Sequence, residues 1–245
     1  MIWALSRTLL AGLLLTPAAY ADKVHVAVAA NFTQVAEELA PLFEAASGHQ
    51  VTYSFGATGQ LFTQISQGAP FEIFLAADDE RPAKAVAEGL GVEGSVFTYA
   101  VGRLALYSTS LDIADGAASL ANGEFDKLAI ADPRTAPYGA AALEVLEAFG
   151  LVDAIGPKLV MGENITQTLQ FIETGNAELG FVAASQVLGK SNVWIVPGDY
   201  HQSIRQDAVL LTTGAGNPAA RAYLDFLKGS AARGVIEAAG YLAEE

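Results

Sequence analysis

Strand-like and helix-like segments alternate along nearly the whole chain, and this alternation constrains the fold more than any other feature of the sequence. Residues 24–28 form a predicted strand, and apolar residues then recur at helical spacing until Gly48 ends the pattern. Continued to the C-terminus, the alternation predicts an α/β fold in which helices cover mostly parallel sheets. The other predicted strands are 51–55, 71–76, 97–107, 128–131, 179–183, 193–196 and 208–213, and the later predicted helices include 78–88, 140–149, 165–173, 218–227 and 231–239.

The pattern runs twice along the chain, which indicates two similarly built halves. The long predicted strand 97–107 carries Gly102 in its middle, where the chain can leave one half for the other. If the halves fold as two lobes, strand-like crossings near Gly102 and near Arg205 join them. Such crossings act as hinges rather than as flexible tethers.

The first residues have the order of features typical of a secretory signal peptide. Arg7 precedes an apolar run over 9–15, and small residues follow at Ala19 and Ala21. The apolar run is far shorter than the roughly 20 residues that a membrane-spanning helix needs. We therefore expect residues 1–21 to be removed and the remaining chain to be exported.

Charge and cysteine content exclude several classes of function. The chain has 13 lysines and arginines against 27 aspartates and glutamates, a formal net charge of −14, so it offers no basic face for nucleic acid. It contains no cysteine, which excludes disulfides, thiolate metal sites and cysteine nucleophiles. With 52% hydrophobic residues over 245 positions, it can bury a substantial core.

Small, neutral residues stand where predicted strands end and helices begin. Open α/β sheets bind ligands at such places, and the N–H groups of a helix N-terminus attract anions because they lack intrahelical partners. Any one junction alone is better explained by ordinary helix capping or a glycine turn. The junctions are Ala29-Ala30-Asn31, Gly56-Ala57-Thr58-Gly59, Ala76-Ala77-Asp78 and Pro137-Tyr138-Gly139, with Glu163-Asn164-Ile165 as a fifth.

Two of these junctions share one local motif. Asn31 and Asn164 each begin the pattern Asn-x-Thr-Gln, which places Asn at an N-cap and Gln at the third helical position, as in a capping box. The Asn-x-Thr part also matches a glycosylation acceptor, an interpretation that the expected caps make less favourable. Asn217, followed by Pro218, is predicted to cap a late helix in the same way.

Signals for an enzyme are weak. The three histidines, His25, His49 and His201, lie apart in the sequence and in no known catalytic motif, so a secreted hydrolase is only a distant alternative. The acidic run 78–80 lacks the spaced oxygen ligands of a calcium loop and is better interpreted as the acidic first turn of a helix. We expect neither a cofactor nor a metal held directly by side chains.

Several stretches together carry a resemblance to a known family. They are VAANFT at 28–33, SFGATGQL at 54–61, GAPFEIFLAAD at 68–78, and Asp132-Pro133 with Pro137-Tyr138-Gly139 downstream. From about Val24 to Leu242 the chain resembles the periplasmic molybdate-binding proteins of ABC importers, which are two-lobed solute-binding proteins of type II. The resemblance implies two lobes, 22–101 with 206–245 and 102–205, each a mostly parallel sheet flanked by helices, with the ligand cleft between them.

The resemblance also implies a set of ligand-binding residues. They are Asn31, Thr58, Ala77, Tyr138 and Ile165, with Ala30, Gly59 and Asn164 as neighbours. Many members have Ser where this chain has Asn31 and Thr58. Some members have Tyr where Ala183 stands here and Ala where Tyr138 stands, so we expect Tyr138 to supply the missing hydroxyl.

The implied function is capture of molybdate, and of tungstate with it, in the periplasm. A monomer would bind the oxyanion through neutral donors and deliver it to a membrane permease with its ATP-hydrolysing subunit. Neutral donors suit such a dianion because every buried oxygen needs a hydrogen bond. A receptor for another small anion, such as sulfate or an organic acid, is the alternative within the binding class.

Overall fold

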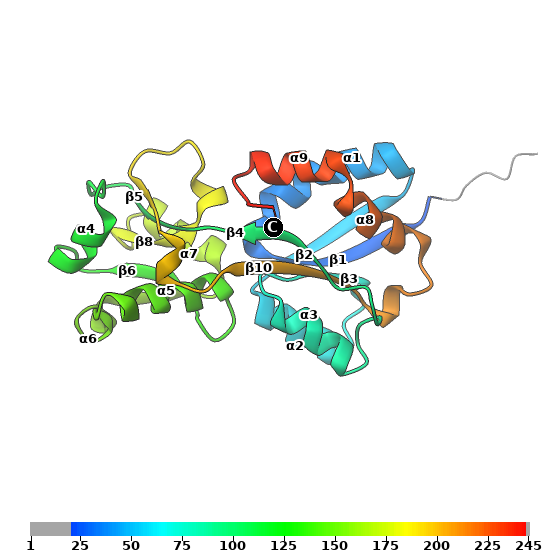
Figure 1. Ribbon diagram of the computed structural model, residues 1–245, viewed down its shortest axis with the longest axis horizontal. Coiled ribbons are helices and arrows are strands. Elements are labelled where there is room, and N and C mark those ends of the chain that lie inside the picture. Colours follow the sequence, from blue (N-terminus) through cyan, green and yellow to red (C-terminus); the bar gives the residue numbers. More distant parts are fainter. Residues whose placement is uncertain (1–20, 244–245) are drawn as a thin grey trace, which may run out of the picture.

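The computed structural model describes residues 21–243 and consists of two lobes, each built around one five-stranded sheet (Figure 1). The predicted signal peptide, residues 1–21, lies outside the described residues except for Ala21. The α/β prediction, with mostly parallel sheets flanked by helices, is confirmed. No helix within residues 21–243 is long and apolar enough to cross a membrane.

The sheet of the first lobe has the strand order β2-β1-β3-β10-β4. β1 pairs in parallel with β2 and β3, whereas β10 runs antiparallel to both of its neighbours, β3 and β4. The carboxyl ends of β1, β2 and β3 therefore meet at one edge. The strands are β1 (Lys23–Ala29), β2 (Gln50–Gly56), β3 (Ile73–Leu75), β4 (Phe97–Gly102) and β10 (Ile204–Leu210).

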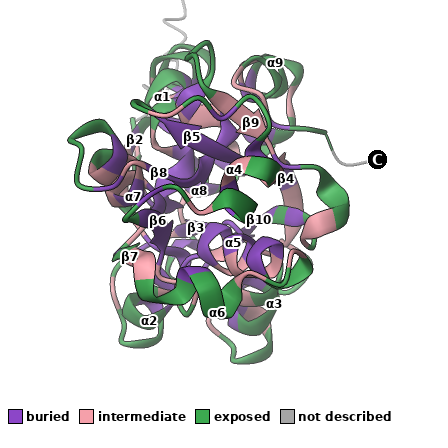
Figure 2. Ribbon diagram, turned by 90° about the vertical axis from the view of Figure 1, so that its left-hand side faces the viewer, coloured by how far each residue is buried: buried purple, intermediate pink, exposed green. Residues whose placement is uncertain are grey.

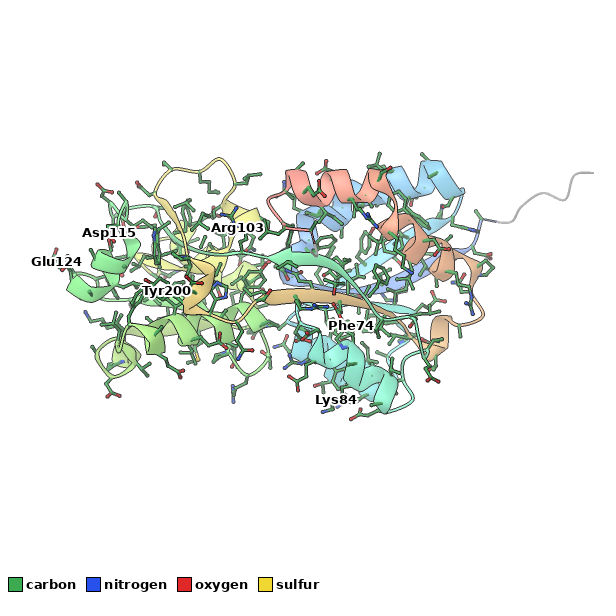
Figure 3. The ribbon with its side chains drawn as sticks, viewed as in Figure 1. Phe74, Lys84, Arg103, Asp115, Glu124 and Tyr200 are labelled. Atoms are coloured by element: carbon green, nitrogen blue, oxygen red, sulfur yellow. The ribbon has the colours of Figure 1, made fainter. Side chains whose placement is uncertain are left out.

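Helices cover both faces of this sheet because alternate strand residues point to opposite sides. Val24, Val26 and Val28 of β1 pack with α1, α8 and α9, whereas Ala27 packs with α2 and α3. Phe74 lies on this second side, next to α3 (Figure 3). The helices are α1 (Thr33–Ser47), α2 (Thr58–Ser66), α3 (Glu80–Ala87), α8 (Pro218–Lys228) and α9 (Ser230–Ala238).

The second lobe repeats the topology with the order β7-β6-β8-β5-β9. β6 pairs in parallel with β7 and β8, and β5 takes the antiparallel place that β10 has in the first lobe. Its buried strands lie at the centre, with exposed helix faces around them (Figure 2). The elements are β5 (Leu104–Ser108), β6 (Leu128–Ala131), β7 (Leu159–Gly162), β8 (Leu179–Ala183), β9 (Val193–Ile195), α4 (Gly116–Asn122), α5 (Pro137–Ala148), α6 (Val152–Ile155) and α7 (Ile165–Glu173).

Short 3-10 helices complete the chain. They are η1 (Ala30–Phe32), η2 (Gly156–Lys158), η3 (Ala184–Val187), η4 (Gly198–Tyr200) and η5 (Thr212–Gly214). η1 joins β1 directly to α1, and η3 directly follows β8. Both therefore continue a strand at its carboxyl end, where the two lobes approach each other.

The predicted strand 97–107 is two strands in two different sheets. The chain leaves β4 at Gly102 and enters β5 at Leu104, so Arg103 lies at the crossing. Close packing explains why residue 102 is a glycine, because a Cβ there would lie 2.2 Å from the Tyr138 hydroxyl oxygen and 2.6 Å from Gln206 Nε2. The crossing position therefore needs a residue without a side chain.

Candidate functional site

A small pocket lies where the carboxyl ends of β1, β2 and β3 face the N-termini of α5 and α7. This is the edge at which open α/β sheets bind their ligands. Twelve residues line it, and none of them is charged. They are Ala29, Ala30, Asn31, Gly56, Ala57, Thr58, Ala77, Ala136, Pro137, Tyr138, Asn164 and Ile165.

The pocket brings together all five residues that the family resemblance implies as ligands. They are Asn31, Thr58 and Ala77 from the first lobe, and Tyr138 and Ile165 from the second. Of the three expected neighbours, Ala30 and Asn164 also line the pocket. Gly59 lies beside it instead, where its N–H donates to the carbonyl of Thr135 across the two lobes over 2.8 Å.

Thr58 is held so that its hydroxyl hydrogen remains available. It is the first residue of α2 and is 1% exposed. Its Oγ1 accepts a hydrogen bond from the backbone N–H of Ala77 over 3.1 Å. The hydroxyl can therefore still donate its own hydrogen, and the Ala77 N–H serves to fix Thr58.

Tyr138 presents a buried phenol from the second lobe. It is the second residue of α5, is 1% exposed, and its hydroxyl accepts from Gln206 Nε2 over 3.0 Å. Ala183 is fully buried in β8 and does not line the pocket. Tyr138 is the tyrosine that lines the pocket, and it comes from α5.

The prediction that Asn31 caps a helix is wrong. α1 begins at Thr33 after η1, and its N-cap residue is Phe32 without a side-chain bond. The Asn31 side chain is buried instead, and its Nδ2 donates to Gln206 Oε1 over 2.9 Å and to the Tyr241 hydroxyl over 3.0 Å. Both hydrogens of Nδ2 are thereby used, so Asn31 has its backbone N–H left to offer the pocket.

Asn164 does cap its helix. Its Oδ1 accepts from the N–H groups of Thr166 and Gln167, both over 3.0 Å, and α7 begins at Ile165. Gln167 does not close the expected capping box, because its Oε1 accepts from the N–H of Glu163, one residue before the cap. The first-turn N–H of Ile165 has no intrahelical acceptor and adjoins the pocket.

An ion pair adjoins the pocket on the side of the first lobe. Asp78 follows Ala77 directly and forms an ion pair with Arg81. Burial raises the pKa of the Asp78 carboxyl, although the hydrogen bonds and charge of Arg81 act in the opposite direction. Arg81 also donates through Nη2 to the carbonyl of Arg134 in the second lobe over 3.3 Å. Its guanidinium therefore offsets the Asp78 carboxylate and contacts both lobes.

Three tyrosines behind or beside the pocket stay protonated. Burial raises the pKa of the Tyr99 and Tyr138 hydroxyls well above the ordinary value. Burial also raises the pKa of Tyr241 to about 12, although hydrogen bonds with Ser185 and Asn31 act in the opposite direction. All three phenols thus keep a hydrogen to donate at neutral pH.

Alkaline titration tests this burial. Because the pKa of Tyr241 rises from 10.0 to about 12 on folding, its contribution to stability is complete below pH 10 and is lost as pH rises through 12. We expect the loss to reach about 3 kcal/mol from this group. Chemical denaturation between pH 9 and 12, with phenolate absorbance followed alongside, measures it. The Tyr241→Phe variant should lose less stability over the same range, and an equal loss would contradict the assignment.

The arrangement lends no support to a hydrolase. His25 Nε2 and Ser54 Oγ lie 2.9 Å apart, but both residues sit within strands and neither lines the pocket. Among residues 21–243, no group of three or more His, Cys, Asp or Glu side chains is placed to hold a metal ion. The chemistry that the pocket offers is hydrogen-bond donation from uncharged groups.

Sequence comparisons identify the relatives of this chain. Residues 24–242 match the family described as bacterial extracellular solute-binding protein. The molybdate-binding protein ModA of Rhodobacter capsulatus is 53% identical over 230 residues, which cover 93% of this chain and 91% of that protein. ModA of Azotobacter vinelandii is 53% identical over 249 residues, which cover 98% of this chain and 99% of that protein.

Solved structures agree with this grouping. The periplasmic molybdate-binding protein of Azotobacter vinelandii superposes with a TM-score of 0.87 at 34% identity, covering 91% of this chain and all of that one. A second structure, the sulfate-binding protein SubI of Mycobacterium tuberculosis, superposes with a TM-score of 0.74 at 14% identity. The match covers 90% of this chain and 86% of SubI, and it shows a shared fold alone. These relatives are solute-binding proteins, and the chain is accordingly not an enzyme. The protein belongs to the bacterial extracellular solute-binding protein family, in which two of its relatives at 53% identity are molybdate-binding proteins.

Proposed function

We propose that this protein captures molybdate, and tungstate equally, in the pocket between its lobes and delivers it to an ABC permease. The observation that carries the proposal is the convergence of uncharged residues from five strand-to-helix junctions, in both lobes, on one pocket. The names of two relatives at 53% identity support molybdate as the ligand.

The donors suit a dianion that carries no proton. Buried oxygens of such an ion each need a hydrogen bond, and helix N-termini provide N–H groups together with a partial positive charge. The hydroxyls of Thr58 and Tyr138 and the N–H groups of Asn31 and Ile165 would surround it, with Ala77 fixing Thr58. Phosphate near neutral pH keeps a proton that needs an acceptor, so donors alone discriminate against it.

Ligand binding would be coupled to closure of the lobes. The lobes already touch through Gly59 and Thr135, and the Thr166 hydroxyl donates to the carbonyl of Ala30 over 3.2 Å. An anion that accepts bonds from both lobes stabilises this closed state, because only closure supplies the full donor set. The permease with its ATP-hydrolysing subunit would then recognise closure as occupancy.

The remaining features of the proposal concern organisation and location. We place the lobe boundaries at 22–101 with 206–245 and at 102–205, close to the end of β4 at Gly102 and the start of β10 at Ile204. The protein would act in the periplasm as a monomer after removal of residues 1–21. It would need no cofactor, and molybdenum would enter only as its oxyanion.

A thermal-shift panel tests this function. At a molybdate concentration 100 times the dissociation constant, unfolding should cost about 2.7 kcal/mol more than without ligand. Tungstate should match molybdate, whereas sulfate, phosphate and organic acids should give small shifts. Thr58→Ala should reduce the molybdate shift while Thr58→Ser preserves it. A larger shift with sulfate or a carboxylate would assign the protein to that anion instead.

A further inference from the structure

The residues behind the pocket form a buried chain of hydrogen bonds that reaches both lobes. Gln206 lies on β10, is fully buried, and does not line the pocket. Its Nε2 donates to the Tyr138 hydroxyl over 3.0 Å, and its Oε1 accepts from Asn31 Nδ2 over 2.9 Å. Asn31 Nδ2 also donates to the Tyr241 hydroxyl over 3.0 Å. Gln206 thus contacts one pocket-lining residue from each lobe.

Tyr241 determines which group donates and which accepts in each of these hydrogen bonds. The Tyr241 hydroxyl donates its single hydrogen to the backbone carbonyl of Asn31 over 2.9 Å, and a carbonyl can only accept. The Tyr241 oxygen must therefore accept from Asn31 Nδ2, whose second hydrogen goes to Gln206 Oε1. This leaves Nε2 of Gln206 facing Tyr138. The Tyr138 oxygen accepts there, and its own hydrogen stays available to the pocket.

The opposite orientation of the Gln206 amide would have the opposite consequence. Oε1 would face Tyr138 and take its hydrogen, and Nε2 would lie beside Asn31 Nδ2 and the Tyr99 hydroxyl in place of Oε1. The Asn31 hydrogen that Oε1 accepts in the observed orientation would then meet a second buried donor. Such an arrangement is unfavourable because each buried donor needs an acceptor. Tyr241 and Asn31 therefore hold Gln206 in the orientation observed, and Gly102 leaves the space in which Gln206 meets Tyr138.

We propose that Gln206, held by Tyr241 through Asn31, is a positioning residue that makes the Tyr138 hydroxyl a donor only and so selects oxyanions that carry no proton. This inference rests on the proposed function, in which Tyr138 faces the bound anion. A Tyr138 hydroxyl turned the other way would present a lone pair, which a protonated oxyanion can use and molybdate cannot. Gln206 therefore sets specificity without touching the ligand.

Gln206→Glu tests the proposal because it reverses the hydrogen bond between residue 206 and the Tyr138 hydroxyl, which becomes the donor. An ionised carboxylate has no hydrogen to donate, so Tyr138 donates to it and turns a lone pair toward the pocket. At mildly alkaline pH both molybdate and hydrogen phosphate are dianions, so the negative charge that Gln206→Glu adds weakens the binding of both anions to the same degree. Their ratio of dissociation constants then reports the direction of the hydrogen. We expect the phosphate-to-molybdate ratio, measured by calorimetric titration, to fall at least about tenfold, the effect of one hydrogen bond.

Two further variants separate an effect on the orientation of the Tyr138 hydroxyl from a general weakening of the binding site. Gln206→Met removes all three hydrogen bonds of the Gln206 amide, with Asn31, Tyr99 and Tyr138, without reversing the Tyr138 hydroxyl. It should weaken the binding of both anions while changing the ratio much less than Gln206→Glu. Tyr241→Phe removes the group that sets the direction, and it should lower the ratio although Tyr241 does not line the pocket. In a Tyr138→Phe background, Gln206→Glu should leave the ratio unchanged, because no hydroxyl remains to be turned.

The outcomes distinguish this inference from the proposed function. Wild-type protein that binds molybdate, together with an unchanged ratio in Gln206→Glu, overturns the positioning role alone. The same fall in ratio with and without the Tyr138 hydroxyl overturns the route through Tyr138. Wild-type protein that binds neither molybdate nor tungstate overturns the proposed function, and the role of Gln206 with it.

Discussion

The Ile165→Pro variant is expected to bind molybdate about 10- to 100-fold more weakly than wild-type protein, because it deletes one backbone N–H beside the pocket. Ile165 is the first residue of α7, where proline is well tolerated because the missing N–H has no intrahelical partner. Asn164 before it has φ −152° and ψ 175°, an extended conformation that a following proline accepts. The helix should therefore remain intact while the donor is lost. Calorimetric titration with molybdate measures the effect.

Ile165→Val is the matched control for this variant. The Ile165 side chain is buried, at 3% exposed, so any shortening costs some stability. Valine has nearly the volume of proline and keeps the N–H, so it should cost about 1 kcal/mol of stability and little affinity. Equal molybdate affinities for the Pro and Val variants would show that the Ile165 N–H does not contact the ligand.

The largest loss of stability is expected from Gly139→Ala, which should lower the free energy of unfolding by about 3 kcal/mol. Gly139 lies in the first turn of α5, and a Cβ there would be 2.1 Å from the carbonyl oxygen of Ala131 at the end of β6. The clash is with backbone, so no rotation of a side chain relieves it. α5 would have to move away from β6, carrying Tyr138 with it, and molybdate binding should weaken as well.

Gly234→Ala provides the control for the same change of residue type. Gly234 lies inside α9, and nothing is within 4 Å of a Cβ built there. Alanine should stabilise that helix by about 0.5–1 kcal/mol. Urea denaturation of both variants gives the comparison, and similar free energies of unfolding at the two positions would refute the close approach of α5 to β6.

Elements with strong local signals were predictable from the sequence. The strands at 128–131 and 179–183 and the helix at 165–173 have the predicted bounds, and Gly48, with φ 72°, ends α1 as expected. Weaker local signals were missed. β7 (Leu159–Gly162) has an apolar run of only three residues before Gly162, shorter than the four to eight residues that mark a buried strand.

One missed helix did carry a usable signal. In α4, the Asp115 side chain caps the N-terminus by accepting from the N–H of Ala118, and Gly123, with φ 64°, ends the helix. An acidic cap followed by a glycine eight residues later is a recognisable pair of helix boundaries. Leu120 is the one large apolar residue between these boundaries, so the segment shows no helical periodicity of large apolar residues.

The residues behind the pocket could not have been found from local patterns. Gln206, Tyr99 and Tyr241 meet through hydrogen bonds between residues that lie more than 100 positions apart, such as the 107 between Tyr99 and Gln206. Nothing near Gln206 in the sequence marks its role. Its partners are selected by the return of β10 to the first sheet, next to β3 and β4.

The sequence by itself determined the α/β alternation, the position of the crossing near Gly102, and the small neutral residues at the strand ends, because each depends on neighbours in the chain. Only the tertiary structure decided what each polar side chain does. The motif Asn-x-Thr-Gln occurs at 31 and at 164, yet only Asn164 caps a helix. Asn31 bonds instead to Gln206, 175 residues away, because a buried amide takes the partners that folding brings to it.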